Sequence, residues 1–186
     1  IVRDGVENGN LDAEVDSSVG QGKGLLAIGS LSGYGKDVSA YLLKELDRLG
    51  FRGWKTRKGS VMADLGGKAK EDAVLLEAHC DTLGAMVHEI KSNGHLKLTN
   101  IGGMQANNAE TENVRIITKR GKIDEGTCQL TNPSVHVNGD YKTTTRTWDS
   151  VEVIVDEEIN SREEAKARGI MAGDYVCFSL LCTNDA

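Results

Sequence analysis

The stretch AVLLEAHCDTLGAMVHEI, residues 73–90, joins two different strand patterns. Its first part, residues 73–78, is almost unbroken in apolar residues, as expected of a strand that helices cover on both faces. After Asp81 apolar and polar residues alternate, which is typical of an antiparallel strand with one face in a core. The sequence therefore predicts a change of architecture within this stretch, from α/β to antiparallel β.

The residues before this stretch carry the pattern of an α/β fold. Apolar residues recur at three- and four-residue intervals over 37–49, which predicts an amphipathic helix. Gly50 follows as the residue that most readily ends a helix in the left-handed conformation. Two short strands, 54–58 and 60–65, are expected on either side of Gly59. Together with the apolar segment, these elements predict the beginning of an α/β domain.

The residues after the stretch predict a small antiparallel barrel or sandwich. Asn93-Gly94 and Arg120-Gly121 stand between alternating segments, as hairpin turns do. Ser161 and Glu164 form a capping box that begins a short helix, and Gly169 ends it. Regular turns between short strands are typical of a β module. The expected strands are 85–91, 95–99, 114–119, 123–129, 135–137, 151–155 and 176–181.

The composition is ordinary for a globular protein, and the length fits one domain or one domain and part of another. The chain has 186 residues and a net charge of −6, so no general attraction to nucleic acid or to an anionic membrane is expected. The basic stretch 48–58 is predicted to be a solvated strand face. No segment approaches the roughly 18 apolar residues of a membrane span. A cytoplasmic location with reduced thiols is expected, because no C-x-x-C spacing occurs among Cys80, Cys128, Cys177 and Cys182.

The first 24 residues are expected to form an irregular lead-in. They are rich in glycine and acidic residues and show no clear period. The run GQGKG at 20–24 is interpreted as a linker, since no strand precedes it as one would precede a phosphate loop. The opening residues lack both an initiator methionine and the order of a signal peptide, so a processed, trimmed or partial chain is expected.

His79 and Asp81 form the most suggestive pair of polar residues. Residues two apart on a strand point to the same side, so both side chains can face one site. A metal-bound imidazole usually donates its other N–H to a carboxylate, which fixes its tautomer. Sites in open α/β sheets also collect beyond the carboxyl ends of strands. On the residues alone, both a metal site and a merely structural pair stay open.

The remaining candidates do not complete a site. His88, His95 and His136 are predicted to be structural or solvent-facing. The carboxylates of 156–158 precede a surface helix and are interpreted as an exposed acidic turn rather than as acid/base groups. Cys80 lies between His79 and Asp81 but points to the opposite face, so it is predicted to pack rather than to react.

Three segments carry a specific resemblance, which covers roughly residues 25–181. The segments are LLAIGSLSGYGKDVSAYLLKELDRLGF, AHCDTLGAMVHEIKSNGHLKLTNIGG and SREEAKARGIMAGDYVCF. Their motifs are Ser-Gly-Tyr, His-x-Asp, Ile-Gly-Gly and Gly-Ile-x-x-Gly-Asp. On these residues the sequence resembles the N-terminal half of the glutamyl (deblocking) aminopeptidase family, the dinuclear-metal peptidases that include the tetrahedral aminopeptidases and some relatives labelled endoglucanases.

The resemblance implies a metal-dependent aminopeptidase that removes N-terminal residues from peptides. His79 matches a metal ligand, and Asp81 matches the catalytic aspartate that orients it. Two divalent metal ions, zinc or cobalt, are implied as cofactors. The family's other functional groups, namely a bridging aspartate, a Glu-Glu pair, a further aspartate and a second histidine, are expected beyond Ala186, so the chain alone is expected to be inactive.

The resemblance also implies an incomplete, phosphorylase/hydrolase-like α/β catalytic domain interrupted by an antiparallel β-barrel that acts as lid and dimerisation domain. Partners are then a peptide substrate and further copies of the chain, with neither nucleic acid nor membrane. The chain departs from relatives at Gly29, Leu31 and Gly35, and in the lead-in that replaces an expected first helix. The expected parts are the lead-in at 1–24, the catalytic domain at 25–84, the barrel at 85–174 and the return to the catalytic domain at 175–186.

Two alternatives stay open beside this interpretation. The related metallocarboxypeptidase and deacylase family also places His-x-Asp-Thr after a strand, but here the chain continues directly into a barrel. A non-catalytic fragment that serves only assembly or partner binding is the other alternative, because one histidine with one carboxylate is fewer than the three protein ligands of a catalytic zinc.

Overall fold

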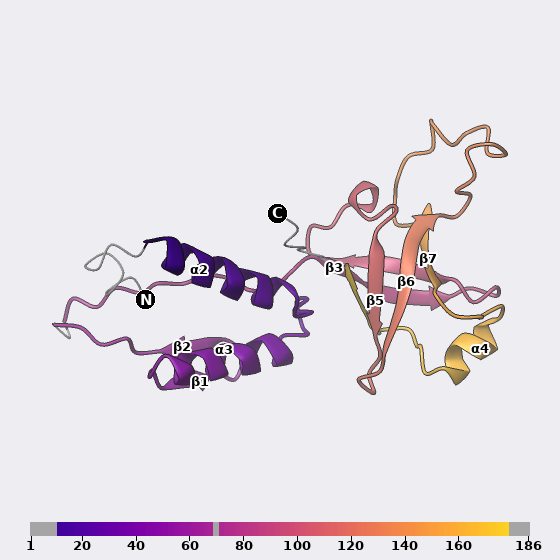
Figure 1. Cartoon of the computed structure of the whole chain (residues 1–186). Helices are drawn as coiled ribbons and strands as arrows, with labels where there is room; N and C mark the ends of the chain where they lie inside the picture. Colours follow the sequence, from indigo (N-terminus) through magenta and orange to yellow (C-terminus); the bar gives the residue numbers. More distant parts are fainter. Residues whose placement is uncertain (1–10, 69–70, 179–186) are drawn as a thin grey trace. The chain divides into compact units, whose positions relative to one another are not determined.

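The computed structural model describes residues 11–68 and 71–178 and divides the chain into two compact units (Figure 1). The first unit includes the described residues up to Asp81, and the second begins at Thr82. The expectations for residues 1–10 and for Cys182 lie outside the described part. The first unit holds α2 (Leu11–Leu26), α3 (Lys36–Arg48), β1 (Gly53–Lys55) and β2 (Val61–Ala63). The second holds β3 (Gly84–Ile90), β4 (Leu96–Ile101), η1 (Ala106–Asn108), β5 (Asn113–Ile117), β6 (Ile123–Leu130), β7 (Val151–Val155), α4 (Arg162–Ala167) and β8 (Tyr175–Phe178).

Helix α3 confirms the predicted amphipathic helix and its end at Gly50. Val38 is buried, as the apolar periodicity requires. Gly50 has a φ of 80°, and its N–H donates to the carbonyl of Asp47. The N–H of Phe51 donates to the carbonyl of Leu46 at 2.8 Å. These two bonds satisfy carbonyls of the last turn and make the Schellman motif that a glycine at this position permits.

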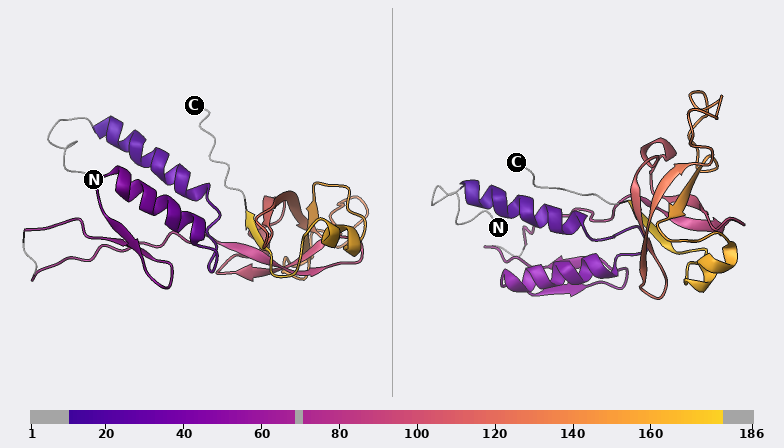
Figure 2. Two further views of the ribbon diagram at one scale, coloured as in Figure 1. Left: turned by 90° about the horizontal axis from the view of Figure 1, so that it is seen from below. Right: turned by 45° about the vertical axis from the view of Figure 1, so that its right-hand side comes forward.

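Helix α2 corrects the expectation of an irregular lead-in for residues 11–24. Three glycines fall inside it, each costing about 1 kcal/mol relative to alanine, and they hide the helical pattern in the sequence. Gly24 has a packing reason: a β-carbon there would lie 2.9 Å from the hydroxyl oxygen of Tyr41 in α3. The glycine therefore leaves room for the Tyr41 side chain beside the last turn of α2. Helix α3 itself packs against the β1–β2 hairpin (Figure 2).

The hairpin of β1 and β2 is confirmed, whereas the predicted strand over 73–78 is wrong. The two strands pair antiparallel around Gly59, which has a φ of 97°. Residues 73–78 take no strand conformation, and the side chains of Val74 and Leu76 are 84% and 83% exposed. An apolar strand of this kind needs partners along its edges and cover on both faces. No strand of the described residues pairs with this segment.

Six strands of the second unit close into an antiparallel barrel in the order β3-β4-β7-β6-β5-β8 (Figure 1). The residue pattern was compatible with either a barrel or a sandwich, and the structure has a barrel. It closes where β3 pairs with β8, with Ala85 opposite Val176 and Met86 opposite Tyr175. Closure leaves the barrel without free strand edges, which in an open sheet invite pairing with another chain. The largest fully buried apolar side chains inside are Leu96, Leu98, Ile116, Leu130, Ile170, Val87, Val114, Val151, Val153 and Val176.

Two segments of this unit differ from expectation. Residues 175–178, expected to begin the return to a catalytic domain, form β8 and belong to the barrel because they pair with both β3 and β5. Residues 135–137, expected as a strand, lie in turns between β6 and β7. Val137 is 79% exposed there, so its hydrophobic side chain supplies no core contact that would hold a strand.

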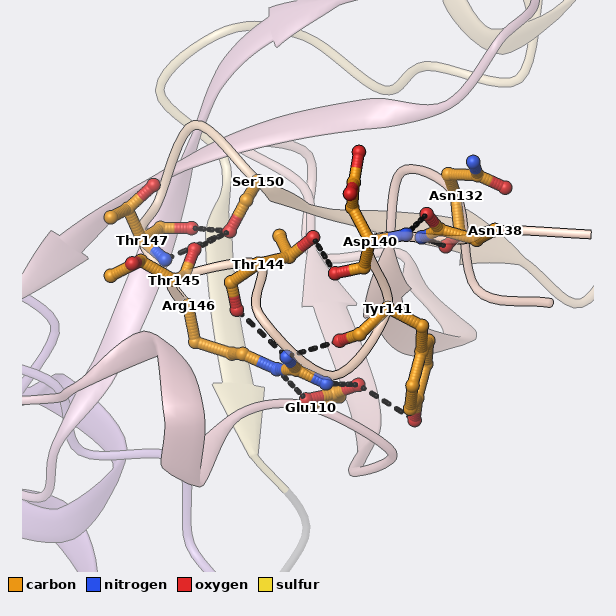
Figure 3. A network of polar contacts seen from close by, with 10 residues as sticks. All are labelled: Glu110, Asn132, Asn138, Asp140, Tyr141, Thr144, Thr145, Arg146, Thr147 and Ser150. Carbon is orange, nitrogen blue, oxygen red and sulfur yellow. Dashed lines mark hydrogen bonds and ion pairs between the residues drawn. The ribbon is translucent and has the colours of Figure 1, made fainter. Parts of the chain in front are cut away.

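The long connection from β6 to β7, residues 131–150, is held by Arg146 (Figure 3). The Arg146 Nε donates to Oε2 of Glu110 at 2.7 Å, and Nη2 donates to Oε1 at 3.2 Å. Nη1 donates to the carbonyls of Tyr141 and Thr144 at 2.9 and 2.7 Å. Both charged side chains are mostly buried, at 19% and 16% exposure. This bidentate pair ties the connection to the segment that precedes β5.

Glu152 and Asp174 are buried carboxylates whose partners explain their presence. Glu152 in β7 accepts hydrogen bonds from Lys91 Nζ at 2.6 Å and from His95 Nδ1 at 2.9 Å. Asp174 is 1% exposed, and its two oxygens accept the main-chain N–H groups of Lys119 at 3.0 Å and Met171 at 2.7 Å. The aspartate of the Gly-Ile-x-x-Gly-Asp motif therefore joins the turn before β8 to the turn after β5.

The predicted Ser161 cap and the helix end of α4 are confirmed, but the return hydrogen bond of Glu164 goes to Asn160 rather than to Ser161 as in a strict capping box. The Ser161 hydroxyl oxygen accepts the N–H of Glu164 at 3.2 Å, and the Glu164 carboxylate accepts the N–H of Asn160 at 2.6 Å. Gly169 ends the helix with a φ of 98°.

Candidate functional site

His79 and Asp81 lie in the extended segment that follows residues 73–78, near the end of the first unit. The Nδ1 atom of His79 is 3.2 Å from Oδ1 of Asp81 and 3.2 Å from the Asp81 main-chain oxygen. Both of these oxygens are acceptors when the carboxylate is ionised, so Nδ1 carries the proton and Nε2 keeps its lone pair. The His79 side chain is 87% exposed. The pair thus presents an oriented, accessible imidazole nitrogen.

The other carboxylate oxygen of Asp81 has a partner of its own. The Ser32 hydroxyl donates to Oδ2 of Asp81 at 2.7 Å. This hydrogen bond is the main reason that the pKa of Asp81 lies below its ordinary value, with smaller contributions from the Asp81 main chain and from His79. The site therefore favours the ionised carboxylate, which is the form whose oxygens both accept hydrogen bonds, here from His79 Nδ1 and from Ser32.

The loop that carries Ser32 is fixed to the same segment by a second serine. Ser30 is fully buried, and its hydroxyl donates to the carbonyl of Cys80 at 2.7 Å. Leu31, between the two serines, is 1% exposed and anchors the loop. Cys80 itself is exposed and free, so the prediction that it packs is wrong. Without a paired strand over 73–78, neither side of this segment is covered by a layer of helices.

A groove of about 1020 Å³ runs past this pair within the first unit. Residues 30–39, the β1–β2 hairpin and residues 77–81 contribute to its walls. Lys36, Lys55 and Arg57 are among its lining residues, so the groove carries positive charge beside the histidine.

At the His79–Asp81 pair the described residues offer one candidate histidine ligand and its carboxylate partner. No group of three or more histidine, cysteine, aspartate and glutamate side chains in the described ranges could hold a metal ion. A catalytic zinc needs about three protein ligands. His79 fits the role of a single ligand, and Asp81 fits that of its orienting carboxylate. The described residues therefore do not make a complete metal site.

The other candidate residues have the ordinary surroundings predicted for them. His95 contacts Glu152 in the second unit, while His88 and His136 are exposed. Residues 156–158 are exposed. The residue that the sequence did not assign is Ser32: its Ser-Gly-Tyr motif was visible, but nothing in the pattern shows that the chain brings it to Asp81.

Helices capable of crossing a membrane are not found in the described part of the chain, where none is sufficiently long and apolar.

Comparison with known proteins gives relatives along most of the chain. The protein named "Putative aminopeptidase YhfE" of Bacillus subtilis (strain 168) is 36% identical over 156 residues, which are 84% of this chain and 45% of the relative. The chain thus spans about half the length of this curated relative. The TET aminopeptidase of a marine sediment Thaumarchaeota archaeon has a similar fold, with a TM-score of 0.76 and 21% identity, over 89% of this chain and 45% of that one.

A second solved structure agrees in fold and extent. The TET1 peptidase of Pyrococcus horikoshii, described as assembling into a tetrahedron or a large octahedral shell, has a TM-score of 0.70 and 22% identity, over 86% of this chain and 46% of that chain. The profile of the M42 glutamyl aminopeptidase family matches residues 59–184, which is about two thirds of the chain. By this match, the chain belongs to the M42 glutamyl aminopeptidase family.

Proposed function

We propose that the chain is the N-terminal portion of a metal-dependent aminopeptidase that hydrolyses N-terminal residues from peptides. Membership of the M42 family supports the reaction class. The observation that carries the proposal is the His79–Asp81 pair, in which a carboxylate and a main-chain oxygen hold the imidazole by Nδ1 and leave Nε2 accessible. This is the arrangement expected of a metal-bound histidine and its orienting partner.

His79 is proposed as a ligand to one of two divalent ions, zinc or cobalt, and Asp81 as the residue that orients it. A pair of such ions, when bound, polarises a peptide carbonyl and lowers the pKa of a bound water. The chain's own contribution is to fix the imidazole tautomer and ring direction before any ion arrives. The positively charged groove that His79 and Asp81 help to line is proposed to receive the peptide.

The proposed domain arrangement follows the change of architecture near Asp81. Residues 25–84 form the first part of an α/β catalytic domain, into which the barrel is inserted as a lid, and the chain returns to the catalytic domain after β8. The exposed apolar residues of 73–78 support this, because they have the composition of a buried strand. A cytoplasmic location is proposed with it, supported by the free thiols of Cys80, Cys128 and Cys177.

Self-association through the barrel is proposed as the mode of assembly. The structural neighbour from Pyrococcus horikoshii is described as forming a tetrahedron or an octahedral shell. Because the barrel is closed, the contact would use side chains and loops rather than strand addition. The exposed Val135 and Val137 of the β6–β7 connection are apolar side chains available on the second unit's surface.

The experiment compares His79→Ala with His88→Ala in the full-length protein. Both remove an imidazole, but only His79 has the carboxylate contact. We expect His79→Ala to lose bound metal, measured by atomic emission, and to lose hydrolysis of aminoacyl nitroanilides. Asp81→Asn is expected to weaken both by about 10- to 100-fold. Full metal content and turnover in both His79→Ala and Asp81→Asn would refute the site.

A further inference from the structure

Ser32 occupies the outer position of a three-residue chain of hydrogen bonds. Its hydroxyl donates to Oδ2 of Asp81 at 2.7 Å, while Oδ1 of the same carboxylate faces Nδ1 of His79 at 3.2 Å. Each carboxylate oxygen thus has its own partner. Two hydrogen bonds therefore set the plane of the Asp81 carboxylate, and rotation about the Cβ–Cγ bond of Asp81 would break both of them.

The turn that presents Ser32 is itself well defined. The N–H of Tyr34 donates to the carbonyl of Leu31 at 2.7 Å, which closes a four-residue turn with Ser32 at its second position. Gly33, at the third position, has a φ of 91°, which favours glycine over other residues. The Ser-Gly-Tyr motif therefore has a physical meaning: the glycine permits the turn, and the turn directs the serine.

One further hydrogen bond and the burial of two residues keep this turn close to the His79 segment. The Ser30 hydroxyl donates to the carbonyl of Cys80 at 2.7 Å, one residue before Asp81. Ser30 and Leu31 are both buried, at 0% and 1% exposure, so the base of the turn does not move freely. One serine thus holds the main chain between His79 and Asp81, and the other holds the Asp81 side chain.

We propose that Ser32 is a positioning residue for the proposed metal ligand: its hydroxyl holds the Asp81 carboxylate in the plane that keeps the proton of His79 on Nδ1. The proposal rests on the proposed function of the His79–Asp81 pair. The tautomer of a histidine is set by the hydrogen bond that its other nitrogen makes. When Asp81 loses Ser32, its carboxylate can turn to water, and only the Asp81 main-chain oxygen, 3.2 Å away, still holds the proton on Nδ1. Nε2 then competes more readily with Nδ1 for the ring proton. A protonated Nε2 cannot bind a metal ion.

The first test reads the tautomer directly, without any metal. Imidazole nitrogen signals of the ¹⁵N-labelled chain are recorded by NMR at a pH where histidine is neutral, and the His79 signal is identified by its loss in His79→Ala. We expect mainly the Nδ1–H tautomer in the parent, a shift toward Nε2–H in Ser32→Ala, and recovery in Ser32→Thr, which restores the hydroxyl. Ser17→Ala, at an exposed serine of α2, is the matched control and is expected to match the parent.

The second test measures affinity for Co²⁺ in the full-length protein by its visible absorption. Ser32→Ala is expected to weaken binding on the order of tenfold, the low end of the range for partners of a metal-bound histidine, and Ser32→Thr to restore it. An unchanged tautomer and affinity in Ser32→Ala, or a failure of threonine to restore them, overturns the proposal. If Asp81→Asn weakens Co²⁺ binding while Ser32→Ala does not, only the Ser32 role fails. If neither Asp81→Asn nor His79→Ala affects it, the proposed function fails as well.

Discussion

Replacing Asp174 by asparagine converts one carboxylate oxygen into an amino group at a site where both oxygens accept main-chain hydrogen bonds. The acceptor distances are 3.0 Å to the Lys119 nitrogen and 2.7 Å to the Met171 nitrogen, and the side chain is 1% exposed. Whichever way the amide turns, its NH₂ group faces one of these N–H donors. One buried main-chain N–H therefore loses its acceptor, and the other keeps a neutral one.

The magnitude follows from these contacts. A hydrogen bond to a charged group contributes about 1.5–3 kcal/mol, and an unsatisfied buried donor costs a similar amount. Removing the charge also relieves its desolvation, which offsets part of the loss. We expect Asp174→Asn to lower the free energy of unfolding of the second unit by about 2 kcal/mol, which at an ordinary denaturant slope moves the urea midpoint by about 1 M.

The assay uses the fluorescence of Trp148, which packs against the barrel core, in a Trp54→Phe background. Urea unfolding of Asp174→Asn is compared with that of Asp156→Asn, the same chemical change at an exposed residue. The control is expected to keep the parent midpoint. A midpoint for Asp174→Asn within about 0.2 M of the parent, at equal slope, would show that the two hydrogen bonds do not stabilise the barrel as reasoned.

The remaining predictions concern the second unit and the thiols. Arg146→Ala should leave the barrel folded but let proteases cleave residues 131–150 faster, because the pair with the segment before β5 is lost; an unchanged cleavage rate contradicts this. Burial raises the pKa of the Cys128 thiol to about 12, so alkylation of the native chain near pH 8, mapped by mass spectrometry, should modify Cys80 and spare Cys128. Above pH 9.0, the ordinary pKa of a cysteine thiol, Cys128 ionises in the unfolded chain but stays protonated in the folded chain. The stability that this thiol contributes should therefore fall as the pH rises from 9.0 toward about 12. Cys128→Ala should flatten that part of the pH–stability curve. Residues 82–178 alone should self-associate at micromolar concentration, and a single monomeric species in sedimentation would refute the proposed assembly role.

Local signals predicted the second unit well. Gly94 and Gly121 adopt positive φ angles at the turns where the sequence placed hairpins, and Gly50 ends α3 as expected. Residue patterns alone could not predict barrel closure, because it depends on the pairing of Ala85 with Val176, far apart in the chain, and local alternation fits a sandwich equally well. Only the family resemblance implied a barrel, and the closed barrel confirms it. Helix propensity concealed α2, because three glycines fall inside it and only Gly24 has a packing contact, with Tyr41 of another helix.

The candidate site was predicted in part for the same reason. The spacing of His79 and Asp81 suggested a pair, and the structure gives that pair a hydrogen bond. Ser32 reaches Asp81 from 49 residues away, and only the folded chain shows that contact. The exposure of residues 73–78 could not be predicted either. An apolar run indicates that a segment would be buried as a strand, but it does not show whether neighbouring strands and covering helices are present.

Pairing of the first barrel strand with the last has a consequence for chain entropy. Ala85 and Val176 are opposite residues on antiparallel strands, so their α-carbons lie about 5 Å apart although about ninety residues separate them. If the barrel unfolds, these two points are joined by a flexible loop of that length, whose closure costs about 4 kcal/mol by the logarithmic length dependence alone. The folded barrel removes this cost for the chain segments on either side of it. Unfolding the barrel should therefore weaken any contact between those flanking segments, even where no barrel side chain touches them.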